Sequence, residues 1–252
     1  MILESFSLSG KVAIVTGART GLGQGMAVGL AEAGADLVLV NRSPMPETEK
    51  IIKGLGRRCV SVIADLATLD PIPEIVSTAL TEFGKIDILV NNAGIIRRAP
   101  SMELTERDWD DVINVNLKTV FFLSQAVAKE MVKNNGGKII NIASMLSFQG
   151  GRLVPSYSAS KGGIASLTKT LANEWAKYNI NVNAIAPGYM ATNNTKALRD
   201  DKERNKSILD RIPAGRWGLP EDLKGAVVFL ASKASDYVNG HILCVDGGWL
   251  AR

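Results

Sequence analysis

Short runs of β-branched and other apolar residues alternate with longer stretches of helical periodicity along the whole chain. The short runs are typical of buried strands, and the longer stretches have the apolar spacing of amphipathic helices. We predict strands at residues 11–16, 36–40, 59–64, 86–90, 138–143, 181–186 and 242–245. We predict helices at residues 25–33, 47–55, 73–83, 108–133, 156–178 and 223–231.

This alternation defines the fold class. Strands that are separated by helices pair in parallel through right-handed crossovers. Because the chain has no internal repeat, linker or low-complexity segment, residues 1–252 are predicted to form a single domain. We expect an α/β Rossmann fold, a doubly wound, seven-stranded parallel sheet flanked by helices. Ligands bind such sheets beyond the carboxyl ends of the strands, so the long segment at about 187–215, which we expect to be irregular, is a candidate lid.

Composition and charge narrow the class of protein further. Apolar residues make up 46% of the chain and charged residues 21%, which excludes disorder. The 29 lysines and arginines are scattered, and residues 199–211 interleave them with acidic residues, so we expect no nucleic-acid partner. Apolar runs such as 226–231 are too short to span a bilayer, so we expect no membrane partner. Residues 1–10 lack a signal-peptide pattern, which favours the cytoplasm.

Two cysteines and one histidine are the other chemically informative residues. Cys59 and Cys244 lie far apart in apolar segments, and we expect both to be buried, reduced thiols. His241 has no metal-ligating companion, so no metal site is expected.

A glycine-rich turn follows the first predicted strand. Residues 16–23 place Gly17, Gly21 and Gly23 in the spacing G-x-x-x-G-x-G, just before a helix. Such a turn lets the backbone approach a pyrophosphate, and the helix offers it free N–H groups and the positive end of its dipole. The alternative is an ordinary strand-to-helix turn. The position after the first strand of a β-α-β unit favours a dinucleotide site.

Two further groups of residues end strands at the same edge of the sheet. Asp65 and Leu66 follow the third strand, and the carboxylate of Asp65 can accept from an adenine amino group. The segment 91–94 follows the fourth strand, and its small residues Ala93 and Gly94 leave room for a ribose. These positions are consistent with a dinucleotide that extends along the edge.

The motifs in combination resemble those of the short-chain dehydrogenase/reductase family. The resemblance rests on residues 16–23 and 91–94, Asn116, Ser144, the Tyr157-x-x-x-Lys161 pair and residues 245–248. It covers the whole chain. Residues 92–98, 147–151, 186–195 and 211–218 resemble a subgroup that acts on deoxy- and keto-sugar acids.

The resemblance implies an oxidoreductase that moves a hydride between a nicotinamide cofactor and a secondary alcohol or ketone of a sugar acid. The catalytic residues would be Asn116, Ser144, Tyr157 and Lys161. The cofactor residues would be Gly17, Arg19, Thr20, Gly21, Leu22, Gly23, Asn41, Arg42, Asp65, Leu66, Asn92, Ala93, Gly94, Tyr157, Lys161, Pro187, Gly188, Met190 and Thr192. A homotetramer is also implied. Trp249 and Leu250 are apolar residues that we expect the chain not to bury by itself.

The catalytic residue types suit alcohol–ketone chemistry. Tyr157 and Lys161 share a helix face, and a neighbouring ammonium lowers the pKa of a phenol toward the working pH of an acid–base group. Ser144 can hydrogen-bond the same substrate oxygen. From the resemblance, the Asn116 side chain would hold a water that connects Lys161 to solvent. Taken alone, the tyrosine and lysine could be an exposed helix pair and the serine an ordinary turn residue. Their combination at one edge of the sheet favours catalysis.

The cofactor preference is open from the residues alone. Asn41 ends the second strand where an acidic residue would repel a 2′-phosphate, and Arg42 and Arg19 can attract one. These residues permit NADP, whereas the resembling subgroup uses mainly NAD. We expect NAD, with NADP as a second cofactor.

The substrate residues come from the same loops. A sugar acid needs a cation for its carboxylate, and of Arg97, Arg98 and Arg152 we select Arg97 and Arg152. Polar and apolar walls would come from Ser144, Met145, Gln149, Asn193, Asn194 and Met190. Alternative functions are a gluconate or polyol dehydrogenase, a 3-ketoacyl-thioester reductase, and a non-catalytic dinucleotide sensor. A complete set of catalytic residues argues against the sensor.

Overall fold

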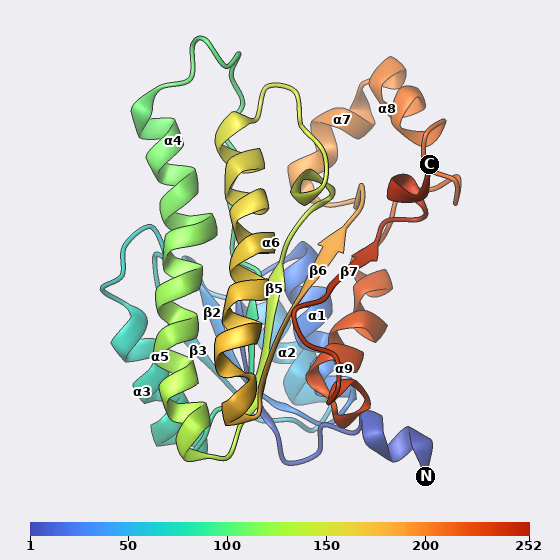
Figure 1. Cartoon of the computed structure of the whole chain (residues 1–252). Helices are drawn as coiled ribbons and strands as arrows, with labels where there is room; N and C mark the ends of the chain where they lie inside the picture. The colour runs from blue at the N-terminus through green and yellow to red at the C-terminus, as the bar shows by residue number, and fades with distance from the viewer.

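Seven parallel strands form one sheet at the centre of the molecule (Figure 1). The computed structural model describes all residues from Met1 to Arg252. The strands lie in the order β3-β2-β1-β4-β5-β6-β7. Their bounds are β1 Val12–Thr16, β2 Asp36–Asn41, β3 Cys59–Ile63, β4 Ile88–Asn91, β5 Gly137–Ile142, β6 Ile180–Pro187 and β7 Ile242–Val245. The predicted fold class and all seven predicted strands are confirmed.

Helices cover both faces of the sheet. One layer consists of α1 (Gly21–Glu32), α2 (Pro46–Gly54) and α9 (Lys224–Ala231). The other consists of α3 (Ile72–Phe83), α5 (Thr119–Lys133) and α6 (Pro155–Trp175). Helix α4 (Glu106–Ile113) precedes α5. The short helices α7 (Lys196–Asp200) and α8 (Lys202–Leu209) stand beyond the carboxyl ends of the strands, beside the end of the chain (Figure 1).

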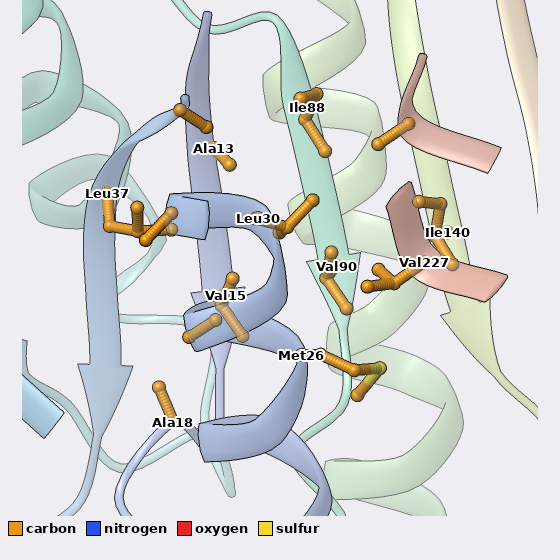
Figure 2. Close-up of a cluster of buried hydrophobic side chains, with 14 of the residues drawn as sticks. Ala13, Val15, Ala18, Met26, Leu30, Leu37, Ile88, Val90, Ile140 and Val227 are labelled. Atoms are coloured by element: carbon orange, nitrogen blue, oxygen red, sulfur yellow. The ribbon is translucent and has the colours of Figure 1, made fainter. Parts of the chain in front are cut away.

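Strand β1 shows how the sequence builds the core. Successive side chains of a strand point to opposite faces, and both faces of this central strand are covered by helices. Ala13 and Val15 point toward Met26 and Leu30 of α1 (Figure 2), while Ile14 packs into the layer of α3, α5 and α6. A strand that is buried on both faces needs apolar residues throughout, which is why its sequence pattern was informative.

The strand order places the functional edge. Strands β1 and β4 are neighbours, and the chain winds outward from them in opposite directions, through β2 and β3 on one side and β5 to β7 on the other. The loops that follow β1 and β4 therefore diverge and leave a crevice between them. The glycine turn lies in the first of these loops, and residues 92–98 lie in the second.

The predicted helix at 108–133 is interrupted. A π-helical turn, Asn114–Lys118, separates α4 from α5 and contains the buried Asn116. Such a turn adds one residue to a helical repeat and often marks a functional site. The candidate lid also differs from the expected irregular segment, because its residues form α7 and α8.

The expected burial of both cysteines is wrong. Cys59 on β3 is partly buried, and Cys244 on β7 is exposed. Strand β7 is the last strand of the sheet, so it has a neighbour on one side only. No helix in the structure combines the length and the apolar character that crossing a membrane requires.

Candidate active site

A cleft of about 1190 Å³ opens at the carboxyl ends of the strands. Most of the predicted site residues line it, from the glycine turn at one end to the lid at the other. They are Gly17, Thr20, Gly21, Leu22, Gly23, Asn41, Arg42, Asp65, Leu66, Asn92, Ala93, Gly94, Arg97, Ser144, Met145, Gln149, Arg152, Tyr157, Lys161, Gly188, Thr192 and Asn193.

Four predicted site residues are absent from the cleft wall: Arg19, Asn116, Pro187 and Met190. Arg19 is exposed, whereas Pro187 and Met190 are buried. Met190 packs in the apolar core, so it is not the pocket wall that the sequence suggested.

The glycine turn requires its glycines. Gly17 and Gly21 have φ angles of +67° and +59°, in the left-handed region that favours glycine. A Cβ atom at Gly23 would overlap the carbonyl oxygen of Gly17. At these three positions no side chain covers the backbone of the turn, which allows a pyrophosphate to approach it closely.

The turn is fixed to the loop after β4. The Thr16 hydroxyl oxygen accepts from the backbone N–H groups of Asn92 and Ala93, both at 3.0 Å. The side-chain amide of Asn92 donates to the carbonyl of Thr16 at 2.8 Å. Helix α1 then begins at Gly21, and no side chain caps its first N–H groups. These groups remain available to an anion at the positive end of the helix, so the residues fit a dinucleotide.

Tyr157 and Lys161 lie in the first turns of α6. Lys161 is buried, and its ammonium donates a hydrogen bond of 2.5 Å to the carbonyl oxygen of Ile142 at the end of β5. The Nζ atom lies 5.6 Å from the centre of the Tyr157 ring. Burial removes water from the ammonium and lowers the pKa of Lys161 to about 8.

The pKa of Tyr157 differs from the sequence expectation. Burial of the phenol raises its pKa, while the nearby Ser144 hydroxyl and the positive charge of Arg98 act in the opposite direction. The expectation that the Lys161 ammonium lowers the pKa of Tyr157 is therefore wrong. The ammonium bonds to Ile142 rather than to the phenol.

Ser144 follows β5 and also caps a short helical turn. Its hydroxyl oxygen accepts from the backbone N–H of Leu146 at 3.1 Å. With that oxygen accepting from Leu146, the hydroxyl hydrogen can be donated to the Tyr157 phenol or to a substrate oxygen in the cleft. Ser144 can therefore cap the helical turn and donate a hydrogen bond to the substrate at the same time.

Asn116 supports the site from behind. Its side-chain oxygen accepts from the backbone N–H of Ile95 at 2.9 Å, and its amide donates to the Ile95 carbonyl at 2.9 Å and to Ser160 at 3.3 Å. Ser160 in turn donates to the carbonyl of Tyr157 at 2.8 Å. Both amide hydrogens are used, so the side chain acts as a brace between the β4 loop and α6. It does not itself offer a donor for the expected water.

The arginines of the cleft are not equivalent. Arg97 pairs with Asp108 at 3.4 Å and with Asp111 at 3.0 Å, so its charge is already compensated. Arg98, which we did not select, acts on the pKa of Tyr157. Arg204 and Arg211 of the lid region also line the cleft, with Trp249 beside them. Sequence reasoning missed them, although residue 211 begins one of the segments that resemble the sugar-acid subgroup.

The fold, the glycine turn and the Tyr157–Lys161 pair define a nicotinamide-dependent oxidoreductase of the Rossmann class. A family model described as enoyl-(acyl carrier protein) reductase matches residues 17–250. Together with full-length relatives of high identity, this match shows that the chain belongs to the short-chain dehydrogenase/reductase family.

Named relatives narrow the comparison. The chain is 65% identical to the 2-dehydro-3-deoxy-D-gluconate 5-dehydrogenase of Escherichia coli K12, over 100% of both chains. A crystal structure from Agrobacterium tumefaciens with bound NADP, provisionally called a 2-deoxy-D-gluconate 3-dehydrogenase, is 60% identical with a TM-score of 0.92, covering 98% of this chain and 99% of that one. A gluconate 5-dehydrogenase from Burkholderia cenocepacia, in complex with NADP and tartrate, is 41% identical with a TM-score of 0.95, over 100% of both chains.

Proposed function

We propose that the chain oxidises and reduces a deoxy- or keto-sugar acid at a secondary alcohol or ketone, in the manner of a 2-dehydro-3-deoxy-D-gluconate 5-dehydrogenase. The observation that carries the proposal is the meeting of Tyr157, Lys161 and Ser144 in one cleft with a bare glycine turn. The 65% identity to the Escherichia coli enzyme of that name supports the substrate class.

The glycine turn and the β4 loop would hold the cofactor. Its pyrophosphate would meet the uncapped N–H groups of α1, and Asp65 lines the same end of the cleft. Ala93 and Gly94 line the cleft beyond the turn. When bound, the nicotinamide supplies or accepts the hydride.

Tyr157 would exchange the proton on the substrate oxygen. In reduction the phenol donates its proton to the new alkoxide, and in oxidation the phenolate takes the proton from the alcohol. Ser144 donates its free hydroxyl hydrogen to the same oxygen and orients it. Lys161, whose pKa is about 8, is able to change charge near the working pH and to stabilise the phenolate when its ammonium turns toward it.

For the cofactor, we propose NAD with NADP also accepted. The Asn41 amide donates to the Ser43 carbonyl at 3.0 Å, which leaves its side-chain oxygen to accept from a ribose hydroxyl. Arg42 next to it lines the cleft and forms no salt bridge, so its charge is available to a 2′-phosphate. Two structural relatives hold NADP, which supports the second cofactor.

Gluconate oxidation is a second candidate. The gluconate 5-dehydrogenase relative has the same fold over the full chain, and its structure contains tartrate, a small dicarboxylate. Both candidates share an acidic, hydroxylated substrate. They differ in the keto and deoxy groups that the cleft must accept.

A panel assay tests the proposal. The purified protein is incubated with NAD or NADP and each of several sugar acids, and absorbance of the reduced cofactor is followed in both directions. We expect turnover with a 2-keto-3-deoxy sugar acid to exceed that with gluconate and with neutral polyols. Turnover restricted to a 3-ketoacyl thioester, or none with any substrate, would overturn the proposal.

We also propose that the chain assembles as a homotetramer. Strand β7 ends the sheet, and an open sheet edge favours association with another chain. The expectation that Trp249 needs a partner chain for burial is wrong, because its own chain buries it to 4% exposure. The proposal therefore rests on the edge strand and the resemblance. Light scattering at micromolar concentration that detects only a monomer would contradict it.

A further inference from the structure

Arg211 lies just after α8, at the point where the lid returns to the body of the molecule. Its guanidinium stacks on the indole of Trp249, with the Cζ atom 4.1 Å from the ring centre. One of its N–H groups donates to the side-chain oxygen of Gln149 at 3.3 Å. The three residues come from the lid, the C-terminal tail and the loop between Ser144 and Tyr157, and all three line the cleft.

The position of this guanidinium is fixed by packing. Trp249 is buried in an apolar cluster with Met145, Ile208 and Ile212. Met145 directly follows Ser144, so the cluster connects the catalytic loop to α8. The Trp249 indole N–H also donates to the Gln149 oxygen at 3.3 Å. A platform of this kind holds an arginine by a cation–π contact and leaves its charge without an anionic partner.

The charge of Arg211 is not compensated within the chain. A guanidinium has five N–H groups, and only one of them is used by Gln149. It forms no salt bridge with a carboxylate, and the acidic residues that neighbour Arg211 and Trp249 in the sequence, Asp210 and Asp246, are bonded to other groups. Asp210 pairs with Lys206 at 2.7 Å, and Asp246 accepts from two backbone N–H groups of the tail.

The other arginines of the cleft lack this combination. Arg97 is neutralised by two aspartates, and Arg42 lines the cleft beside Asn41, at the opposite end from the lid. Arg98 lies close enough to Tyr157 to act on its pKa. Arg152 and Arg204 are exposed like Arg211, but no side chain holds them as Trp249 and Gln149 hold Arg211. Arg211 is the cleft arginine that is both fixed in place and free of an anionic partner.

We propose that Arg211, oriented by Gln149 and Trp249, binds the substrate carboxylate and thereby determines specificity for acids over neutral sugars. This inference deepens the proposed function and rests on it. In a sugar acid the carboxylate and the reacting alcohol lie at separate parts of the molecule. The substrate would span the cleft from Tyr157 to the lid, with its carboxylate on the free N–H groups of Arg211. Because both donors hold the Gln149 oxygen, the Gln149 amide is free to donate to a substrate oxygen.

The test uses two substrates and three variants. kcat and KM are measured for the best sugar acid and for its neutral polyol or ketose analogue, with one cofactor at fixed pH. Arg211→Gln removes the charge, and Arg211→Lys keeps the charge but loses the planar fork. Lys202→Gln is the matched control, because it removes a positive charge from α8 at an exposed position that is outside the cleft and forms no salt bridge.

We expect Arg211→Gln to raise KM for the acid at least about tenfold, the scale of a lost charge-assisted hydrogen bond, with kcat for the acid and both constants for the neutral analogue near wild type. Arg211→Lys should lie between, and Lys202→Gln should match wild type. Added salt should raise KM for the acid in wild type but not in Arg211→Gln.

Two outcomes would overturn the inference while the proposed function stands. One is an unchanged KM for the acid in Arg211→Gln. The other is an equal loss with the acid and the neutral analogue, which would mean that Arg211 only supports the lid. A wild type that acts on no sugar acid would instead overturn the proposed function, and this inference with it.

Discussion

Lys161 donates its ammonium hydrogen to the carbonyl oxygen of Ile142, at a distance of 2.5 Å, across the interior between α6 and β5. The bond fixes the lysine in a buried place where its charged form is disfavoured, and the pKa falls to about 8. The same burial raises the pKa of Tyr157. Burial therefore moves the two pKa values apart, because it favours the neutral form of each group and so lowers that of the lysine and raises that of the tyrosine.

The lowered pKa of Lys161 predicts a pH-dependent cost to stability. Between about pH 8 and 10.5 the unfolded chain binds more protons at this residue than the folded chain, so this contribution to stability rises with pH. Below that window the cost is complete and amounts to about 3 kcal/mol. We expect the free energy of unfolding of Lys161→Met to be higher than that of wild type. The difference should be largest at neutral pH and should shrink toward pH 10.5. Denaturation curves across the window measure it, and a constant difference would contradict the buried charge.

Tyr157→Phe should remove the proton exchange while it keeps the ring packed. General acid–base catalysis contributes about 10²-fold or more, so we expect turnover to fall by at least that factor. Cofactor binding, followed by fluorescence titration, should change little. Tyr178→Phe is the control because Tyr178 is an exposed tyrosine outside the cleft. Near-normal turnover in Tyr157→Phe would show that another group exchanges the proton.

The sequence predicted those features of the fold that depend on local pattern. Strands such as β1 are buried on both faces, so every position is apolar and the run is visible without knowledge of its neighbours. The π-helical turn at Asn116 could not be seen in the same way. Asn116 in this turn is bonded to Ile95, which is far away in sequence, and a local pattern contains no record of such a contact.

The site residues that belong to a sequence motif could be predicted. Those whose position is set by contacts between distant segments could not. Gly17 and Gly23 follow from their spacing and place. Arg211 is positioned by Trp249 and Gln149, which lie on other segments, and no local sequence pattern predicts such a stack. The burial of Trp249 was mispredicted for the same reason, since the lid that covers it looked irregular in the sequence.

Trp249→Ala should damage the substrate end of the cleft. The indole stacks edge-on against Tyr189 at 4.8 Å and packs on Met145, and removing a buried tryptophan typically costs roughly 3–5 kcal/mol. We expect a lower melting temperature and a higher KM for the substrate, with little change in cofactor affinity. Light scattering should show that the variant keeps the oligomeric state of wild type, because the Trp249 side chain is buried by its own chain. A variant that loses assembly and keeps its KM would assign Trp249 to an interface.

Gly23→Ala should abolish cofactor binding. A Cβ at this position meets the Gly17 carbonyl and the Asn92 side chain, so the turn must open. Gly225→Ala is the matched control, because the same change there meets no atom within 4 Å and favours helix α9 by about 0.5–1 kcal/mol. Calorimetric titration with NAD and NADP, together with melting curves, separates loss of the site from loss of the fold. Tight binding by Gly23→Ala would contradict the proposed pyrophosphate site.

Asn41→Asp tests which cofactor the second strand selects. Asn41 is neutral and its amide is held by the Ser43 carbonyl, so wild type has an acceptor for a ribose hydroxyl but no charge to repel a 2′-phosphate. A carboxylate adds a charged acceptor and a repulsive interaction with NADP. A hydrogen bond to a charged group contributes roughly 1.5–3 kcal/mol, so the NAD/NADP ratio of kcat/KM should rise about tenfold or more.

The matched change is Arg42→Ala at the neighbouring residue, which removes the cation that would attract the phosphate and should lower kcat/KM for NADP while leaving the value for NAD nearly unchanged. Both ratios are measured with one substrate at fixed pH and salt, because the phosphate interaction is screened by ions. A wild type that strongly prefers NADP would overturn the proposed preference for NAD. If the ratio does not move in Asn41→Asp, residue 41 does not face the ribose. Arg42 would then be the residue that senses the 2′ position, and its own variant would show the larger change.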